Sequence, residues 1–212
     1  MEIEVKYQAL EKITAEQIEN LDFSPYTRGP RVIHPLYDTL LDTHDLTIKK
    51  QRHRLRVRRD GEQYILALKG PVTQVGELSV REEYELLLTS DDPYSVATWP
   101  EEIRSRVHAL IGDTPLHGLV QVYNHRRAWN IYQAGQQVAE IVLDEGSIEA
   151  GGLQEAMHEV EVELKEGGNE QDAATISAIL LTHLPIKPSS EGKAKRGYSL
   201  LKRSQKTKKE AE

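Results

Sequence analysis

Three short segments of the chain place charged side chains at every second position. Residues 2–6 have the sequence Glu-Ile-Glu-Val-Lys, residues 54–58 Arg-Leu-Arg-Val-Arg, and residues 159–163 Glu-Val-Glu-Val-Glu. Successive side chains of a strand point to opposite faces, so each segment predicts a strand with one charged and one apolar face. Carboxylate rows can hold a divalent cation, and guanidinium rows can bind phosphate oxygens.

An ordinary antiparallel strand with a solvated polar face is the alternative interpretation of any one segment. Taken together, however, two of the rows each hold charges of one sign, three arginines at 54–58 and three glutamates at 159–163, and like charges at next-nearest positions repel one another. Arg81, Glu83 and Glu85 form a further charged row, and Glu140 and Asp144 lie in phase with each other. A bound metal ion would offset the carboxylates and a polyanion would offset the arginines, which favours a shared charged interior.

Most of the remaining pattern indicates β-strands. Asp60-Gly61 and Gly135-Gln136 predict tight turns between neighbouring strands. Period-two alternation predicts strands at residues 2–7, 54–58, 64–69, 82–88, 120–132, 138–143 and 158–165.

Three segments predict helices. One begins at Thr14, one runs from Pro100 to Gly112, and one begins at Asn169. A short helical turn is expected after Gly197. The fold class is therefore α+β, with antiparallel strands forming a closed β-barrel around the charged side chains and helices packed outside on the apolar faces.

Composition narrows the class of protein. The 212 residues, with 38% hydrophobic and 29% charged residues, suit one globular domain, and the chain begins without a signal-like segment, so a cytoplasmic protein is expected. The absence of cysteine excludes thiol catalysis and cysteine-bound zinc. Although residues 193–209 contain eight Lys/Arg and no acid, the net charge of −7 argues against a general nucleic-acid binder.

Histidine and serine chemistry is not indicated. The eight histidines form no metal-binding spacing such as His-Glu-x-x-His, and Ser189-Ser190 lacks the glycines of a nucleophile elbow. Chemistry is therefore expected from the charged rows.

The opening Glu2-x-Glu4-x-Lys6 resembles the signature of CYTH domains, also called triphosphate tunnel metalloenzymes. The resemblance continues in order along nearly the whole chain. The further matching stretches are Tyr37-Asp38-Thr39, Leu55-Arg56-Val57-Arg58, Leu68-Lys69, Arg81-x-Glu83-x-Glu85, Arg126-x-x-Trp129, Leu143-Asp144-x-Gly146, Glu159/Glu161/Glu163 and Lys193-x-x-Arg196-Gly197-Tyr198.

This resemblance implies an eight-stranded antiparallel tunnel, Mg²⁺ or Mn²⁺ as cofactor, and a triphosphate substrate. The implied metal ligands are Glu2, Glu4, Asp144, Glu161 and Glu163. The implied phosphate-binding residues are Lys6, Arg56, Arg58, Lys69, Arg126, Lys193 and Arg196. Catalytic roles are expected for Lys69, Glu83 and Glu85, and the two glutamates could act either on the metal or in positioning water. The chain departs from the family pattern at Arg54, where relatives often have a small residue, and in its third late glutamate.

The expected function is metal-dependent cleavage of the terminal phosphate of inorganic triphosphate. An adenylyl cyclase, a thiamine triphosphatase and a non-catalytic polyphosphate-binding module remain alternatives. A tunnel domain is expected over residues 1–200 and a basic tail over residues 201–212. The expected partner is a small triphosphate rather than nucleic acid or a membrane, and a homodimer is compatible with the sequence.

Overall fold

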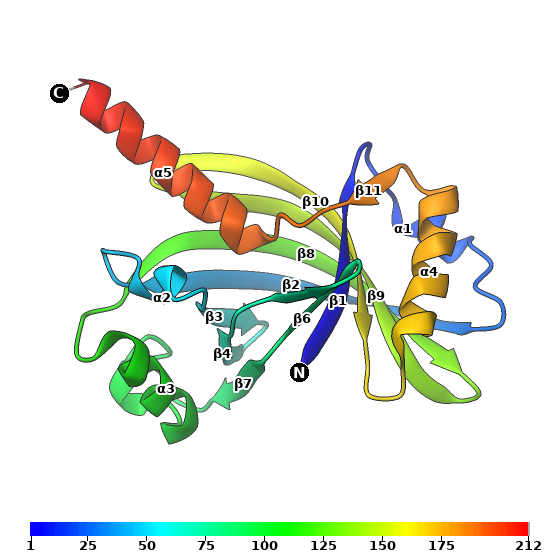
Figure 1. Cartoon of the computed structure of the whole chain (residues 1–212), viewed down its shortest axis with the longest axis horizontal. Helices are drawn as coiled ribbons and strands as arrows, with labels where there is room; N and C mark the ends of the chain where they lie inside the picture. The colour runs from blue at the N-terminus through cyan, green and yellow to red at the C-terminus, as the bar shows by residue number, and fades with distance from the viewer. Residues whose placement is uncertain (212) are drawn as a thin grey trace.

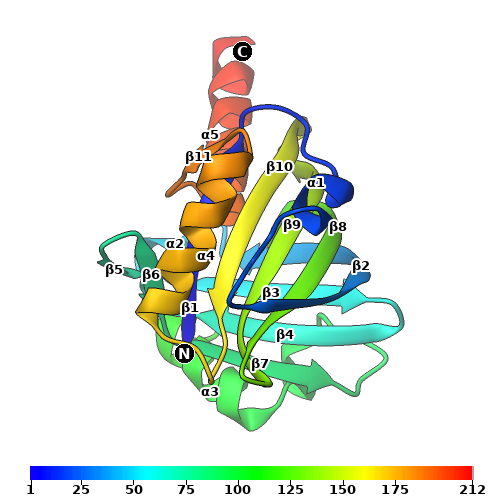
Figure 2. The same ribbon diagram turned by 90° about the vertical axis from the view of Figure 1, so that its right-hand side faces the viewer.

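The computed structural model describes residues 1–211 and shows a strongly curled antiparallel sheet with helices on both of its surfaces (Figures 1 and 2). The strands are β1 (Glu2–Ala9), β2 (Thr27–Asp42), β3 (Arg54–Asp60), β4 (Gln63–Lys69), β5 (Thr73–Val75), β6 (Leu78–Arg81), β7 (Glu83–Leu88), β8 (His117–Gln133), β9 (Gln136–Ala150), β10 (Leu153–Leu164) and β11 (Ile186–Pro188).

The hydrogen-bonded strand order is β5-β6-β1-β10-β9-β8-β2-β3-β4-β7, with β11 added beside β1. The eleven strands therefore form an open ladder, not the closed ring of eight that the sequence predicts. The two ends of the ladder are nonetheless consecutive in the chain. β6 pairs with β1, β7 pairs with β4, and only Glu82 separates β6 from β7. The sheet is interrupted at Glu82 because the chain changes partner there, from β1, which pairs with β6, to β4, which pairs with β7.

The long strand β2 was not predicted from the sequence. It pairs with both β8 and β3 and so joins the two longest parts of the sheet. Pro30 and Pro35 interrupt its pattern and lack an N–H for the ladder, and the register with β8 shifts between Arg28 and Arg31. β2 therefore forms because it pairs with β8 and β3, although its own sequence pattern only weakly indicates a strand.

The three predicted helices are confirmed. α1 (Ala15–Glu19) has the Thr14–Gln17 capping box, α3 (Glu101–Ile111) follows Pro100 and ends at Gly112, and α4 (Glu170–His183) is capped by Asn169. Three further helices differ from the prediction: two were not predicted, and the third is longer than the short turn expected after Gly197. They are α2 (Thr47–Lys50), the 3₁₀ turn η1 (Val96–Thr98) and α5 (Lys193–Ala211).

The segment expected to be a basic tail continues α5 through Ala211. The domain boundary at residue 200 stays a prediction. No helix within residues 1–211 is long and apolar enough to cross a bilayer.

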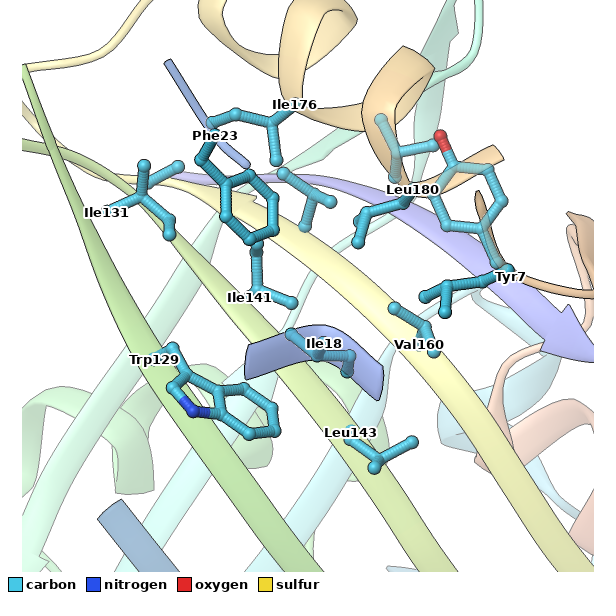
Figure 3. Packing of buried hydrophobic residues seen from close by; sticks show 14 of the residues in the cluster. Tyr7, Ile18, Phe23, Trp129, Ile131, Ile141, Leu143, Val160, Ile176 and Leu180 are labelled. Atoms are coloured by element: carbon cyan, nitrogen blue, oxygen red, sulfur yellow. The ribbon is translucent and has the colours of Figure 1, made fainter. Parts of the chain in front are cut away.

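Hydrophobic cores cover the outer faces of the sheet. α1 and α4 pack on β1, β8, β9 and β10 through residues such as Ile18, Trp129, Ile141, Val160 and Ile176 (Figure 3). A second cluster packs α2 and α3 against β3 and β4. Because the apolar faces are buried outward, the opposite faces of the same strands are left for charged side chains.

α5 is an exception to the prediction that all helices lie outside. Its Ala194, Tyr198 and Leu200 join Val120 and Ile148 in a third core. Val120 and Val122 lie opposite Leu40 and Asp38 in the β8–β2 register, so they share the face that carries the charged side chains. The inner surface is therefore divided into an apolar part under α5 and a charged part beyond it.

Candidate active site

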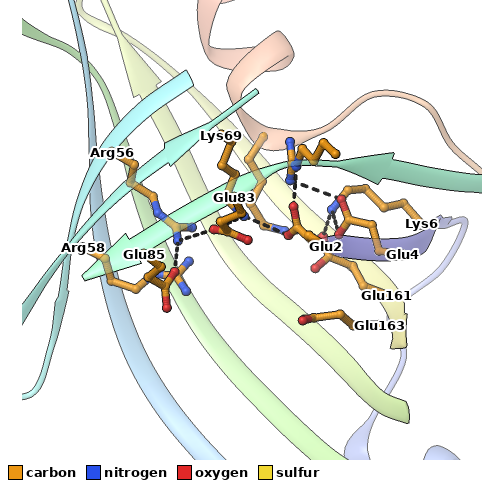
Figure 4. Close-up of polar contacts among 12 residues, drawn as sticks. Glu2, Glu4, Lys6, Arg56, Arg58, Lys69, Glu83, Glu85, Glu161 and Glu163 are labelled. Atoms are coloured by element: carbon orange, nitrogen blue, oxygen red, sulfur yellow. Dashed lines mark hydrogen bonds and ion pairs between the residues drawn. The ribbon is translucent and has the colours of Figure 1, made fainter. Parts of the chain in front are cut away.

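A cavity of ≈ 390 Å³ is lined by the charged faces of the strands (Figure 4). Nine cationic and seven anionic side chains line it. Of the residues predicted from the sequence, it brings together Glu2, Glu4, Lys6, Arg56, Arg58, Lys69, Glu83, Glu85, Arg126, Glu161, Glu163 and Lys193.

Strand register explains why side chains so far apart in sequence meet. Glu4 pairs with Glu163 and Lys6 with Glu161 across β1 and β10. Residues opposite each other in an antiparallel pair lie on the same face, so the rows on β1 and β10 point into one cavity.

The carboxylates of β1 are held by cations from three directions. Lys69 Nζ lies 2.8 Å from Glu2 Oε1, and the Arg81 guanidinium donates to Glu2 and, at 3.3 Å, to Glu4 Oε1. Lys6 Nζ lies 2.7 Å from Glu4 and 2.6 Å from Glu161. Burial alone raises the pKa of Glu2, but the charges of Lys69 and Arg81 outweigh burial and hold that pKa well below its usual range.

The arginines of β3 surround a carboxylate from β2. Arg58 donates through Nε and Nη2 to the two oxygens of Asp38, at 2.7 and 2.8 Å, and Arg56 Nη1 lies 3.4 Å from Asp38 Oδ2. Burial raises the pKa of Asp38, but Arg56 and Arg58 lower it to about 2. Asp38 therefore keeps two adjacent arginines from repelling each other.

Asp38 is a site residue that the prediction omitted, together with Arg81, Arg54 and Lys165, all of which line the cavity. A signal for Asp38 was present. It lies two residues from both Leu36 and Leu40, so these three side chains share one face of β2, and the two leucines mark that face as buried.

Lys69 lies between acidic groups at the junction of β4, β7 and β1. Its Nζ is 2.8 Å from Glu83 and 2.8 Å from Glu2. Burial, Arg56 and Arg81 lower the pKa of Lys69. Glu85 lies further out, with 46% of its side chain exposed and an oxygen 3.2 Å from Arg56 Nη2.

Two predicted site residues do not line the cavity. Asp144 is completely buried behind it, where it receives two hydrogen bonds from Arg126 at 2.7 and 2.9 Å and lies 2.8 Å from Lys193 Nζ. Arg196 points to the far end of β10, where it contacts Glu155 and Glu159. Lys193 and Arg196 are three positions apart and therefore neighbours on the surface of α5, and both contact Glu159, at 3.0 and 2.8 Å. Lys193 also reaches Asp144 and Glu161, whereas Arg196 reaches Glu155.

The carboxylates suit a hard divalent cation, which prefers oxygen ligands. Burial raises the pKa of Glu163, as do Glu140 and Glu2, so this carboxylate lacks full compensation of its charge. Within the described part of the chain, no three His, Asp or Glu side chains already surround one point. Lys6, Lys69 and Arg81 lie between the carboxylates, so a cation would have to replace some of these ion pairs.

Comparison with known proteins gives concordant results. The family model described as the CYTH domain matches residues 1–198. An inorganic triphosphatase from Haemophilus influenzae is 31% identical over 168 residues, which cover 78% of this chain and 46% of that protein. The chain thus spans about half the length of this curated relative.

Solved structures share the fold. A Hippeastrum protein, named as an adenylyl cyclase candidate with a dominant triphosphatase activity, superposes with a TM-score of 0.64 at 19% identity, covering 96% of both chains. The mimivirus capping enzyme triphosphatase has a TM-score of 0.50 at 11% identity, covering 86% of this chain and 89% of that one. With the ordered charged rows and the family match over nearly its whole length, this chain belongs to the CYTH domain family.

Proposed function

We propose that this protein is a metal-dependent hydrolase that cleaves the terminal phosphate of inorganic triphosphate. The observation that carries the proposal is the cavity, whose described lining has nine cations and seven carboxylates. Its excess of positive charge complements a triphosphate bound with a divalent cation, which together have a small net negative charge. The curated relative from Haemophilus influenzae bears the name of this activity.

The cavity is proposed to be a closed tunnel of eight strands. β6 and β7 are separated only by Glu82 and pair with the two edges β1 and β4. Counted as one interrupted strand, they complete a ring with β1, β10, β9, β8, β2, β3 and β4. The short strands β5 and β11 are then additions outside the ring.

Phosphate is proposed to be held by cations that several elements of the fold, β1, β3, β4, β8 and α5, bring to the cavity. Arg56 and Arg58 can each present two parallel N–H groups to phosphate oxygens, and lysines act as single point charges. The other proposed phosphate ligands are Lys6, Lys69, Arg126 and Lys193. No aromatic ring is among the described residues that line the cavity, so nothing there would stack on a nucleobase, which favours the inorganic substrate.

Mg²⁺ or Mn²⁺ is proposed to bind Glu2, Glu4, Glu161 and Glu163. When bound, such an ion neutralises phosphate charge and helps to orient the attacking water. Because Asp144 lies behind the cavity, we do not propose it as a metal ligand. Its proposed role is to hold the side chains of Arg126 and Lys193 in position.

The residues of the chain would act mainly by positioning, which is the principal requirement of phosphoryl transfer. Water adds to the terminal phosphorus, the bridging P–O bond breaks, and phosphate and pyrophosphate leave. We propose that Lys69 balances charge on the bridging oxygen and that the half-exposed Glu85 orients water. Glu83, 2.8 Å from Lys69, supports the first role by holding the lysine in position.

Phosphate release from triphosphate with Mg²⁺ tests this proposal. We expect Glu4→Ala and Arg58→Ala to lower kcat/KM by roughly 100-fold or more, because each removes charge stabilisation inside the cavity. Lys69→Ala should also reduce kcat/KM while the fold is retained. Arg59→Ala is the matched control, since Arg59 is the exposed neighbour on β3 and its guanidinium lies over Tyr37. Active, folded Glu4 and Arg58 variants would refute the proposed site.

Adenylyl cyclase activity is the second candidate, because three structural relatives carry that name. Product analysis with ATP separates the two reactions. A cyclase releases cyclic AMP and pyrophosphate, whereas a hydrolase releases nucleoside diphosphate and phosphate. Thiamine triphosphate belongs in the same assay panel. Metal-dependent polyphosphate binding without turnover of any substrate would instead indicate a binding module.

A further inference from the structure

A second basic depression lies next to the cavity, outside the site described above. It has a volume of ≈ 510 Å³ and lies between the α2–β3 turn, the loop after β4 and the first half of α5. Its charged lining residues within the described chain are all basic, with no carboxylate among them. This basic groove is lined by Lys49, Arg52, His53, Arg54, Lys195 and Lys202, together with Val72, Tyr198 and Ser199.

Arg54 connects the basic groove to the cavity, because it lines both. Its guanidinium reaches the start of α5, where Nη1 lies 3.6 Å from the position that a Cβ on Gly192 would occupy, close to the side chain of Lys6. Among the described side chains Arg54 has no hydrogen-bond or ion-pair partner, whereas Arg56 and Arg58 on the same strand are both paired with Asp38. Arg54 is therefore a half-buried cation that no described carboxylate contacts, and it lies where the cavity meets the basic groove.

Arg52 provides a second observation. It has φ of 63°, in the left-handed region that favours glycine, yet the chain has a long cation there. Its backbone N–H donates to Lys49 at 2.9 Å, and its guanidinium donates to the Val72 carbonyl at 3.2 Å. These contacts fix Arg52 at the rim of the basic groove.

The lining chemistry points to a phosphate chain rather than to nucleic acid. Tyr198 is buried and Lys49 covers its ring at 4.7 Å, so the aromatic ring is not available for stacking on a base. Arg52, Lys195 and Lys202 are solvent-exposed, whereas His53 and Arg54 are half-buried. Within the described part of the chain, Lys195 is the one cation of the basic groove with a carboxylate at ion-pair distance, Glu191 at 3.2 Å.

We propose that the basic groove binds the continuation of a linear inorganic polyphosphate chain whose terminal phosphates occupy the cavity. The inference rests on the proposed triphosphatase function and extends its substrate class to chains longer than three phosphates. Arg54 contacts the chain where it passes from the cavity into the basic groove. Arg52, Lys195 and Lys202 then neutralise the phosphates that lie outside.

The test compares triphosphate with long-chain polyphosphate as substrates of the double variant Arg52→Gln/Lys202→Gln. Neither residue lines the cavity. We expect KM for the long chain to rise about fivefold through the loss of two exposed charge contacts, while KM and kcat for triphosphate stay unchanged. Lys12→Gln/Lys187→Gln is the matched control, because it removes two exposed lysines that line neither space.

A parallel change of KM for both substrates, or no change for either, would overturn the inference. An effect confined to RNA bearing a 5′-triphosphate would also overturn it, in favour of a nucleic-acid groove. Calorimetric titration with long-chain polyphosphate gives a readout that does not need turnover. If the wild-type protein hydrolyses no triphosphate, the proposed function fails, and weaker polyphosphate binding by the double variant would still support the basic groove.

Discussion

At the scale of single residues, the site is built from ion pairs whose members are nearly all withdrawn from water. Arg58 with Asp38 and Arg126 with Asp144 are two-pronged pairs, and Lys193 contacts three carboxylates. Removing one member of a buried pair is costly because the other charge is left uncompensated. These pairs therefore hold the cations in position before a ligand arrives.

Asp38 gives a prediction about acid stability. Its pKa is about 2 in the folded chain against an ordinary 3.8, so the group stabilises the fold above pH 4 and loses this contribution as pH falls through about 2. The shift corresponds to roughly 2 kcal/mol. We expect Asp38→Asn to lower the free energy of unfolding at neutral pH and to reduce its decline between pH 4 and pH 2, as measured by urea denaturation.

The exposed Asp45 provides the control for that experiment, since Asp45→Asn should leave the whole profile unchanged. Glu2 and Asp144 also have lowered pKa values and remain in the Asp38 variant, so its acid-dependent decline should be smaller but still present. Identical slopes in the Asp38 variant and the wild type would contradict the assigned pairing.

At the scale of elements, the sheet and α5 have different tasks. The strands present charge inward because their apolar faces are buried under α1, α4 and α3. α5 closes the apolar part of the inner face and carries Lys193 to the cavity wall. The close approach of α5 to β8 depends on Gly197, because a Cβ there would collide with Val120.

Gly197→Ala should therefore displace α5 from β8. We expect a loss of about 1–3 kcal/mol from overpacking and a lower Tm, with a rise in KM for triphosphate as Lys193 shifts. Adding Val120→Ala should recover part of the stability, so that the two substitutions are not additive. Ser199→Ala, on the exposed side of the same helix, is the control. Additive losses in the double variant would refute the proposed contact.

At the scale of the whole molecule, stability and chemistry are placed on opposite faces of one sheet. The main hydrophobic clusters lie outside the curl, under helices, and the interior holds a charged cavity of ≈ 390 Å³. A conventional barrel of this size fills its interior with side chains or holds one small ligand. Here cationic side chains outnumber carboxylates in the cavity lining, so a bound anion would compensate the remaining positive charge.

This charge imbalance predicts that ligand binding stabilises the fold. Triphosphate with Mg²⁺, at about 100 times its Kd, should raise the stability by about 2.7 kcal/mol and the Tm by roughly 5 °C or more. Arg58→Ala should abolish the shift in differential scanning fluorimetry, and Arg59→Ala should retain it. An equal shift in both variants would place the ligand outside the cavity.

The alternation in residues 2–6, 54–58 and 159–163 was sufficient to predict which side chains share a charged face, because a strand has a period of two whatever its neighbours are. The caps at Thr14 and Asn169 likewise marked helix starts through purely local hydrogen bonds. These features depend on residues close together in the chain.

What the tertiary structure alone decided is which charges meet. Register between distant strands pairs Glu4 with Glu163, and strand packing brings Asp38 to Arg58 and Lys69 to Glu2. The same packing puts Asp144 behind the cavity and pairs Arg196 with Glu155 and Glu159 outside the cavity lining. Such choices depend on long-range pairing and on the burial of apolar faces elsewhere, neither of which a local pattern contains.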